Sequence, residues 1–231
     1  MSPRPRNDAR RPNLHSEIKN IAWKQIAELG ATTLSLRAVA RELNIAAPSI
    51  YNYFPSRDDL ITALIMDAYE SLAEALVASV ENFSEDKLEE RLIALGWAYR
   101  QWAVMYSQRY LLIFGTPIPK YNAPEEVTMP AAERALIPLV AVIQAIFTAG
   151  RLRVESFAPL TPQLEAMLKL WQAASGGIHP EILYLTQIFW SRVHGLVMLE
   201  ITHQIPSFFN DPAKLFEREL NTILIQYLRS T

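Results

Sequence analysis

Two short apolar-patterned segments separated by a tight break constrain the fold more than any other part of the sequence. The first, Ser35–Leu43, repeats its apolar residues every three or four positions, which indicates a short amphipathic helix. Asn44 follows, and asparagine readily takes the left-handed conformation that ends a helix. The second begins at Pro48, which suits a first helical turn, and extends to about Phe54. The sequence therefore predicts two short helices joined by a turn of a few residues.

Longer helices are predicted on both sides of this pair. Apolar residues recur at helical spacing from Asn13 to Leu29, and Gly30 follows as a candidate helix end. After Pro55 the segment Ser56–Asp59 resembles a capping box and would open a long helix that reaches about Val80. A supporting helix followed by two short ones is the helix-turn-helix plan, in which the second short helix enters the DNA major groove.

The residue types in the pair divide into a buried set and a projecting set. The apolar side chains from Val39 to Phe54 can fix the angle between the two short helices, with Ser35 as the cap of the first. The hydroxyl, amide and small side chains suit base edges, thymine methyl groups and phosphates, and the arginines suit phosphates. The alternative is a small helical hairpin with ordinary surface tyrosines. The residues predicted to contact DNA are Arg37, Ala47, Pro48, Ser49, Tyr51, Asn52, Tyr53 and Arg57.

The charge is unevenly distributed along the chain. The formal net charge of −2 argues by itself against general affinity for nucleic acids. Residues 1–57, however, hold nine lysines and arginines against four acids, whereas the remainder holds 13 against 20. A basic head on an acidic body favours a polyanion-binding module joined to a part that stays away from the polyanion. A basic tail and chance are the alternative explanation.

The segment "LSLRAVARELNIAAPSIYNYFPSRDDLITALI" resembles the DNA-binding domain of TetR-type transcriptional regulators. The matching positions are Val39, Ala40, Ile45, Ile50, Tyr51, Tyr53, Phe54, Ser56 and Leu60. Three positions depart from the pattern: Asn44 replaces a glycine, Ala46 replaces the usual capping Ser or Thr, and Arg57 replaces a lysine. The resemblance implies a regulator of transcription, and for the family as a whole a repressor.

The rest of the chain predicts further helices and no convincing strand, so the expected fold class is all-α. Proline and glycine clusters separate helices near 87–106, 108–114, 125–149, 162–174, 180–203 and 212–229. Pro130 and Pro138 would start or kink the helix near 125–149. We expect a flexible basic arm at 1–12, a helix-turn-helix domain at 13–56, and a helical effector-binding and dimerisation domain at 57–231.

Aromatic residues concentrate in this larger part. The stretches "GWAYRQWAVMYSQRYLLIF" and "FWSRVHGLVMLEI" resemble a TetR subgroup with a Trp-x-x-x-His-Gly motif in its C-terminal domain. The resemblance implies a pocket for a small apolar or aromatic effector, and a homodimer through the last two long helices. Plain core packing is the alternative for each aromatic, as is monomer core for the apolar residues of those helices. The predicted ligand-binding residues are Trp97, Trp102, Tyr106, Tyr110, Phe114, Trp171, Trp190 and His194.

A double-stranded, pseudo-palindromic DNA operator and a small-molecule effector that releases the protein from it are therefore the expected partners. No nucleophile elbow, phosphate loop or dinucleotide fingerprint occurs, so we predict no catalytic residue and no cofactor. The alternative is a helical-bundle enzyme or metal-binding protein with a site around Glu200 and His203, whose spacing matches half of a di-iron ligand set. A second such pair is missing from the sequence, so no metal is predicted.

The expected location is the cytoplasm, without a membrane partner. The chain has no cysteine, which fits a reducing compartment and is compatible with any other. Its polar start lacks the apolar core of a secretory signal. Apolar stretches such as 135–147 are interrupted and too short for a membrane span, and they predict buried helix instead.

Overall fold

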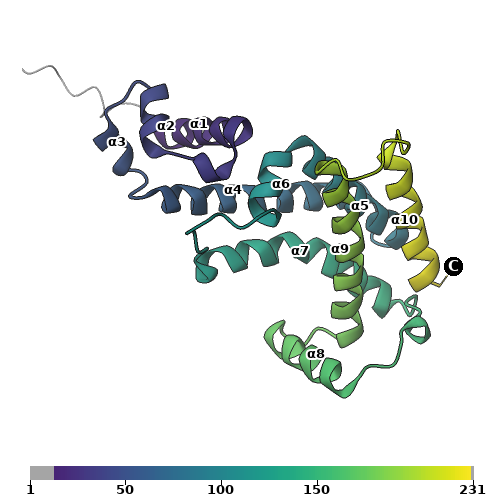
Figure 1. The fold of residues 1–231 in the computed structure, drawn as a ribbon. Helices are drawn as coiled ribbons and strands as arrows, with labels where there is room; N and C mark the ends of the chain where they lie inside the picture. The colour runs from purple at the N-terminus through teal and green to yellow at the C-terminus, as the bar shows by residue number, and fades with distance from the viewer. Residues whose placement is uncertain (1–12, 230–231) are drawn as a thin grey trace, which may run out of the picture. The chain divides into compact units, whose positions relative to one another are not determined.

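The computed structural model describes residues 13–229, and regular structure within this range is helical except for one isolated β-bridge between Leu152 and Leu228 (Figure 1). The expected all-α class is confirmed. The elements in chain order are α1 (Leu14–Leu29), η2 (Ala31–Thr33), α2 (Leu36–Glu42), α3 (Ala47–Tyr51), α4 (Arg57–Glu81), α5 (Leu88–Met105), α6 (Ser107–Phe114), α7 (Glu125–Thr148), η3 (Val154–Ser156), α8 (Pro162–Ala174), α9 (Pro180–Ile201) and α10 (Pro212–Tyr227).

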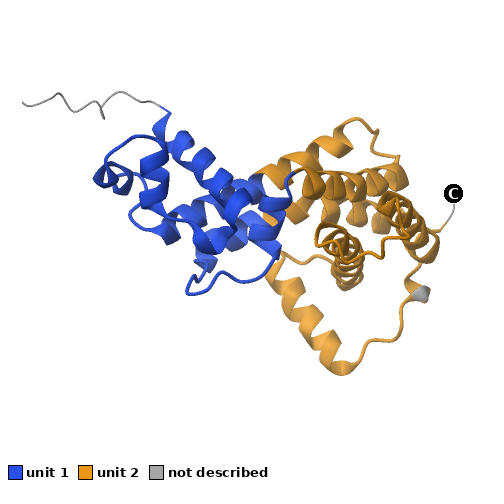
Figure 2. Cartoon of the chain, turned by 45° about the horizontal axis from the view of Figure 1, so that its top comes forward, with its two compact units in different colours: residues 1–70, 106–132 blue, residues 71–105, 133–231 orange. Residues whose placement is uncertain are grey.

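The chain divides into two compact units, coloured separately in Figure 2. Unit 1 comprises residues 1–70 and 106–132, and unit 2 comprises residues 71–105 and 133–231. Unit 1 therefore combines α1, α2 and α3 with the start of α4, with α6 and with the first turns of α7. The predicted basic arm at 1–12 lies outside the described residues.

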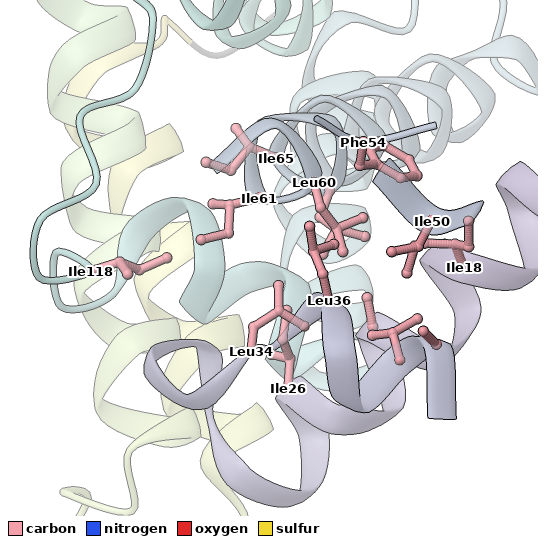
Figure 3. Packing of buried hydrophobic residues seen from close by; sticks show 14 of the residues in the cluster. Ile18, Ile26, Leu34, Leu36, Ile50, Phe54, Leu60, Ile61, Ile65 and Ile118 are labelled. Atoms are coloured by element: carbon pink, nitrogen blue, oxygen red, sulfur yellow. The ribbon is translucent and has the colours of Figure 1, made fainter. Parts of the chain in front are cut away.

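An apolar cluster forms the core of unit 1 (Figure 3). Helix α1 contributes Leu14, Ile18, Ala22 and Ile26, whose spacing of four residues places them on one helix face, where all are buried. Helices α2, α3 and α4 add their buried residues to the same cluster. Ile118, from the segment between α6 and α7, joins it with only 8% of its surface exposed. Residues distant in sequence therefore complete the core around the two short helices.

Helix ends lie where the sequence places them in most cases. Gly30 ends α1 with φ at 82°, a value that favours glycine. The backbone N–H of Asp59 donates to Ser56 Oγ at 3.1 Å, and the Ser56 hydroxyl donates to the Asp59 carboxylate at 2.7 Å. Thr161 and Asp211 likewise accept backbone N–H groups at the starts of α8 and α10. The capping box predicted at Ser56–Asp59 is thus confirmed, and α8 and α10 begin with side-chain caps of their own.

Three local expectations are corrected by the structure. Ser35 occupies the N-cap position of α2 but makes no side-chain capping hydrogen bond. Helix α3 ends at Tyr51 rather than near Phe54. Pro130 and Pro138 both lie inside the continuous helix α7, so neither of them starts it, and a kink at either proline stays a prediction.

Unit 2 is built on the mutual packing of α5, α9 and α10, with α8 against α9. Gly96 lets α5 approach α10 closely, because a Cβ atom there would lie 2.6 Å from Leu220 Cδ2. Ion pairs between distant segments join Arg151 to Glu89, and Arg192 to Glu219. Glycine at position 96 therefore has a packing role that no local sequence signal indicates.

Replacing Ile118 tests whether the segment after α6 belongs to the core of unit 1. We expect Ile118→Ala to lower the free energy of unfolding by about 2–4 kcal/mol, because it removes buried methyl groups and leaves a cavity. Leu29→Ala is the control: Leu29 is 64% exposed, and the change should stay within about 0.5 kcal/mol. Urea titration followed by circular dichroism measures both, and equal small effects would contradict this placement.

Candidate nucleic-acid interface and effector region

The turn between α2 and α3 fixes the two short helices. Asn44 has φ at 53°, so it takes the left-handed conformation that the sequence predicts, and its N–H donates to Arg41 O at 3.1 Å. The N–H of Ile45 then donates to Ala40 O at 3.0 Å. Ala40 and Ile50 are almost completely buried where the helices pack. The angle between α2 and α3 is therefore set by a hydrogen-bonded turn and by apolar contact.

Most of the predicted DNA-contacting residues lie on the surface of unit 1. Tyr51 is 41% exposed and Tyr53 38%, and Pro48 and Asn52 are exposed as well. Because α3 ends at Tyr51, Asn52 and Tyr53 lie in the turn that follows the helix. Arg37 projects from the first turn of α2 and is also exposed.

Two residues of the α3 region lie deeper than the rest of the predicted set. Ser49 is buried, with 7% of its surface exposed, so its side chain is not free to project as we expected from the sequence. Ala47 is half-buried. Ala46 provides no side-chain cap at the start of α3, and the first turn is closed by Ser49 N–H donating to Ala46 O at 2.9 Å. The outer face available to a ligand therefore consists of Pro48, Tyr51, Asn52 and Tyr53.

Arg57 is half-buried, and its guanidinium group is hydrogen-bonded to the protein. Its Nε donates to Leu34 O at 3.2 Å, and its Nη2 donates to Ala31 O and to Thr32 O, both at 3.2 Å. These carbonyls belong to the η2 segment that connects α1 to α2. The guanidinium thus joins the start of α4 to this segment, which leaves it fewer donors for a phosphate than we expected.

The predicted ligand-binding residues are distributed over both units. Tyr106, Tyr110 and Phe114 belong to unit 1, where Tyr110 is fully buried against Phe114. Arg109 lies between two rings of the same unit, with its guanidinium carbon 5.3 Å from the ring centre of Trp23 and 4.9 Å from that of Tyr106. This cation–π contact joins α1 to the α6 region and was not predicted from the sequence.

In unit 2, two tryptophans of α5 have different environments. Trp102 is buried, and its Nε1–H donates to Ser71 Oγ of α4 at 3.0 Å. Trp97 packs against Phe216 of α10, with ring centres 5.3 Å apart. The packing of Trp97 is therefore of the kind expected for a core residue between α5 and α10.

His194 lies at the centre of an aromatic and polar group on α5 and α9. Its Nδ1 lies 2.8 Å from the hydroxyl oxygen of Tyr99, and its ring centre lies 5.0 Å from that of Trp190. Burial lowers the pKa of His194, which favours the neutral ring. In the tautomer with an unprotonated Nδ1, that nitrogen can accept a hydrogen bond from the Tyr99 hydroxyl. Gly195 beside it has open space where a Cβ would lie.

Trp171 lies apart from these groups and lines a pocket of about 490 Å³ between α7, α8 and α9. None of the other seven predicted ligand residues lines that pocket. The structure therefore brings Trp190 and His194 together in unit 2, and Tyr110 and Phe114 together in unit 1.

The alternative site at Glu200 and His203 is not formed. Helix α9 ends at Ile201, and His203 lies beyond it with φ at 55°, so the two residues do not share a helix face. Both carboxylate oxygens of Glu200 accept from Arg100, with Nε to Oε2 at 2.7 Å. Among the residues that the structure describes, no group of three or more His, Asp or Glu side chains is arranged to hold a metal ion.

Comparison with known proteins decides the family. Residues 20–64 match the family described as "Bacterial regulatory proteins, tetR family", and residues 92–223 match "Tetracyclin repressor-like, C-terminal domain". The chain belongs to the TetR family. Its members are DNA-binding transcriptional regulators of the helix-turn-helix type, and such regulators are not enzymes in general.

Individual relatives agree with this membership over nearly the whole chain. The chain is 29% identical over 220 residues to HTH-type transcriptional regulator Rv1816 of Mycobacterium tuberculosis, covering 95% of this chain and 94% of that protein. The crystal structure of regulatory protein SCO4313 matches this chain with 35% sequence identity and a TM-score of 0.77. The match covers 96% of this chain and 99% of that chain. A protein of unknown function from Rhodococcus sp. RHA1 shares the fold, with 17% sequence identity and a TM-score of 0.74. This match covers 96% of this chain and 100% of that chain.

Removing the Arg57 side chain should destabilise this TetR-family DNA-binding segment. We expect Arg57→Ala to cost about 1–2 kcal/mol of unfolding free energy, because three backbone carbonyls lose a charged donor. Arg37→Ala, which removes an exposed arginine from the same unit, should change it by less than about 0.5 kcal/mol. Thermal unfolding measures both variants. Equal, small effects would show that the Arg57 contacts contribute little.

Ionisation of His194 should make stability fall in mild acid. The unfolded chain binds a proton on this ring near pH 6.5, whereas the folded chain, with its lowered pKa, binds it only at lower pH. The contribution of neutral His194 is therefore complete above about pH 6.5 and is lost as the pH falls toward the folded pKa. Urea unfolding between pH 7.5 and 5 should show a steeper loss for the unmodified protein than for His194→Phe, and parallel curves would contradict this assignment.

Proposed function

We propose that the protein is a dimeric transcriptional repressor that a small apolar or aromatic effector releases from a pseudo-palindromic operator. One observation carries the DNA-reading half: Tyr51, Asn52 and Tyr53 are exposed beside the α2–α3 turn, whose helices are fixed by buried Ala40 and Ile50. Amide and hydroxyl groups at these positions can read base edges in a major groove. Family membership supports the same assignment.

We assign different roles to the arginines of this region. Exposed Arg37, in the first turn of α2, would contact a backbone phosphate, where it adds affinity without reading sequence. Arg57 would act indirectly, by holding the segment before α2 through its three carbonyl partners. The basic residues between Arg4 and Arg11 would add salt-sensitive contacts to phosphates or to the minor groove.

The two copies would associate through α9 and α10. Leu199 on α9 and Ile225 on α10 are exposed, and a helix could approach Gly195 closely because no atom fills the space there. Other apolar residues of these helices do not serve this role: Leu220, Ile223 and Tyr227 are buried in the monomer core. A two-fold axis would present the two α3 helices to successive major grooves.

We place the chain in the TetR subgroup with the Trp-x-x-x-His-Gly motif, on the basis of the Trp190, His194 and Gly195 arrangement. The Tyr99–His194 hydrogen bond next to the Trp190 ring provides both an apolar wall and a polar anchor, the combination that small-molecule sites use. An effector would release DNA only by binding two conformations of the protein with different affinities. Helix α4, whose residues belong to both units, is the proposed connection.

We place the protein in the cytoplasm, as expected for soluble regulators of this family. By length and composition alone, helices α7 and α9 are long and apolar enough to cross a membrane. From the sequence we instead expected apolar stretches too short for a membrane span. Core helices of soluble proteins pass the same test, and α9 packs against α5, α8 and α10 in unit 2. The family match supports a soluble protein.

Substituting the exposed face of the α3 region tests the DNA-reading assignment. An operator is first selected from random duplexes with the unmodified protein at about 150 mM salt. We then expect the double variant Tyr51→Ala, Asn52→Ala to bind it about 10- to 100-fold more weakly, because each base contact contributes about 1–3 kcal/mol. Fluorescence anisotropy with labelled operator gives the dissociation constants.

The pair Phe209→Ala, Asn210→Ala is a matched control, since it removes an adjacent aromatic and asparagine that are also exposed. Its operator affinity should be unchanged. Unchanged affinity of the Tyr51, Asn52 variant would refute the DNA-reading assignment. If no compound in a library of apolar and aromatic metabolites altered operator affinity, the effector half would fail.

A further inference from the structure

The pocket between α7, α8 and α9 belongs to unit 2 and is separate from the Tyr99–His194–Trp190 group. It encloses about 490 Å³, which lies within the range of sites for small organic ligands. Its walls are largely apolar, with Leu136, Ile137 and Val140 from α7, Trp171 from α8, and Leu183 from α9. Ile137 is 58% exposed and Trp171 38% exposed, so a ligand there would cover apolar surface that solvent now contacts.

Three uncharged polar side chains line the pocket, and each donates one hydrogen bond to another part of the protein. Thr186 donates its hydroxyl to Ile182 O at 2.7 Å, Ser175 donates to Gln172 O at 3.2 Å, and Gln144 Nε2 donates to Thr148 Oγ1 at 3.2 Å. All three keep oxygen lone pairs, which accept hydrogen bonds, and Gln144 also keeps the second N–H of its amide. The pocket therefore offers an oxygen acceptor from each of these residues, while the hydroxyl protons of Thr186 and Ser175 serve the protein itself.

Glu133 adds a negative charge to the same wall. Positions 133, 137, 140, 141 and 144 follow helical spacing, so they lie along one face of α7 that is about 16 Å long at 1.5 Å per residue. Glu133 stands at the beginning of this face and Gln144 at its end. Within residues 13–229 the exposed Glu133 carboxylate has neither a hydrogen bond nor an ion pair, so it is available to a ligand.

We propose that this pocket binds a lipophilic primary amine, with its apolar part against Val140 and Trp171 and its ammonium group directed to Glu133. An ammonium group supplies three donors and no acceptor, which complements a lining that presents oxygen acceptors and one carboxylate. A carboxylic acid of the same shape would be repelled, and a neutral alcohol would gain no ion pair. The proposal concerns binding and does not depend on the operator function.

Three compounds with one skeleton test this preference: phenylbutylamine, phenylbutanol and phenylbutyrate. Isothermal titration calorimetry with the full chain at pH 7 should show the amine binding about fivefold more tightly than the alcohol, the gain an exposed ion pair can give. Phenylbutyrate should bind most weakly. Equal affinity for the three compounds, or preference for the acid, would overturn the proposal.

Two variants locate the binding on this pocket. Glu133→Gln should lower the affinity for the amine to within about twofold of that for the alcohol and leave the alcohol affinity unchanged. Glu126→Gln, an exposed acid of α7 outside the pocket, is the matched control and should leave both unchanged. Val140→Trp should fill the pocket and abolish binding of all three, with its melting temperature reported as a check on folding.

The remaining outcomes also decide the question. Amine binding that Glu133→Gln and Val140→Trp leave intact would place the amine elsewhere and overturn the proposal. Failure of the unmodified protein to bind any of the three compounds would overturn it as well. If sedimentation then showed a dimer that Val140→Trp dissociates, the occupant of the pocket would be a second copy of the chain.

Discussion

The packing of α2 against α3 inside the core of unit 1 is the constraint on which the proposed DNA-reading surface depends. The four residues between α2 and α3 have little freedom, because Asn44 takes a left-handed conformation and Ile45 is hydrogen-bonded back to α2. Burial of Ile50 then fixes α3 on its inner side, so that Tyr51 and Asn52 are directed outward. A rigid inner face is what allows a helix of five residues, far too short to be stable alone, to keep one orientation.

Sequence periodicity predicts the helices, apart from the end of α3, but not the contacts between distant segments. Asn44, Gly30 and the Ser56–Asp59 cap act locally, through their own backbone and neighbours, and each was predicted correctly. Arg57 has partners 23 to 26 residues away that are backbone carbonyls, which carry no side-chain signature. Ile118 likewise gives no local sign that it completes the core around α2 and α3.

The candidate effector residues show the same limit. The spacing of Trp190 and His194 correctly placed their rings on one side of α9, because residues four apart share a helix face. Grouping Trp171 with the other aromatics relied on residue type alone, and the structure places it in a separate pocket with α7. Glu200 and His203 fail for a related reason: their spacing has meaning only within a helix, and α9 ends between them.

The distribution of residues between the two units bears on how a regulator of this family could transmit a signal. Unit 1 contains α6 and the segment through Ala132, so the core around the DNA-reading helices includes residues far along the chain. Arg109 between the Trp23 and Tyr106 rings and Tyr121 bonded to Thr62 join this later segment to α1 and α4. A ligand that displaced α6 relative to α1 and α4 would have to disrupt these contacts, and it could do so only by binding the displaced conformation more tightly than the present one.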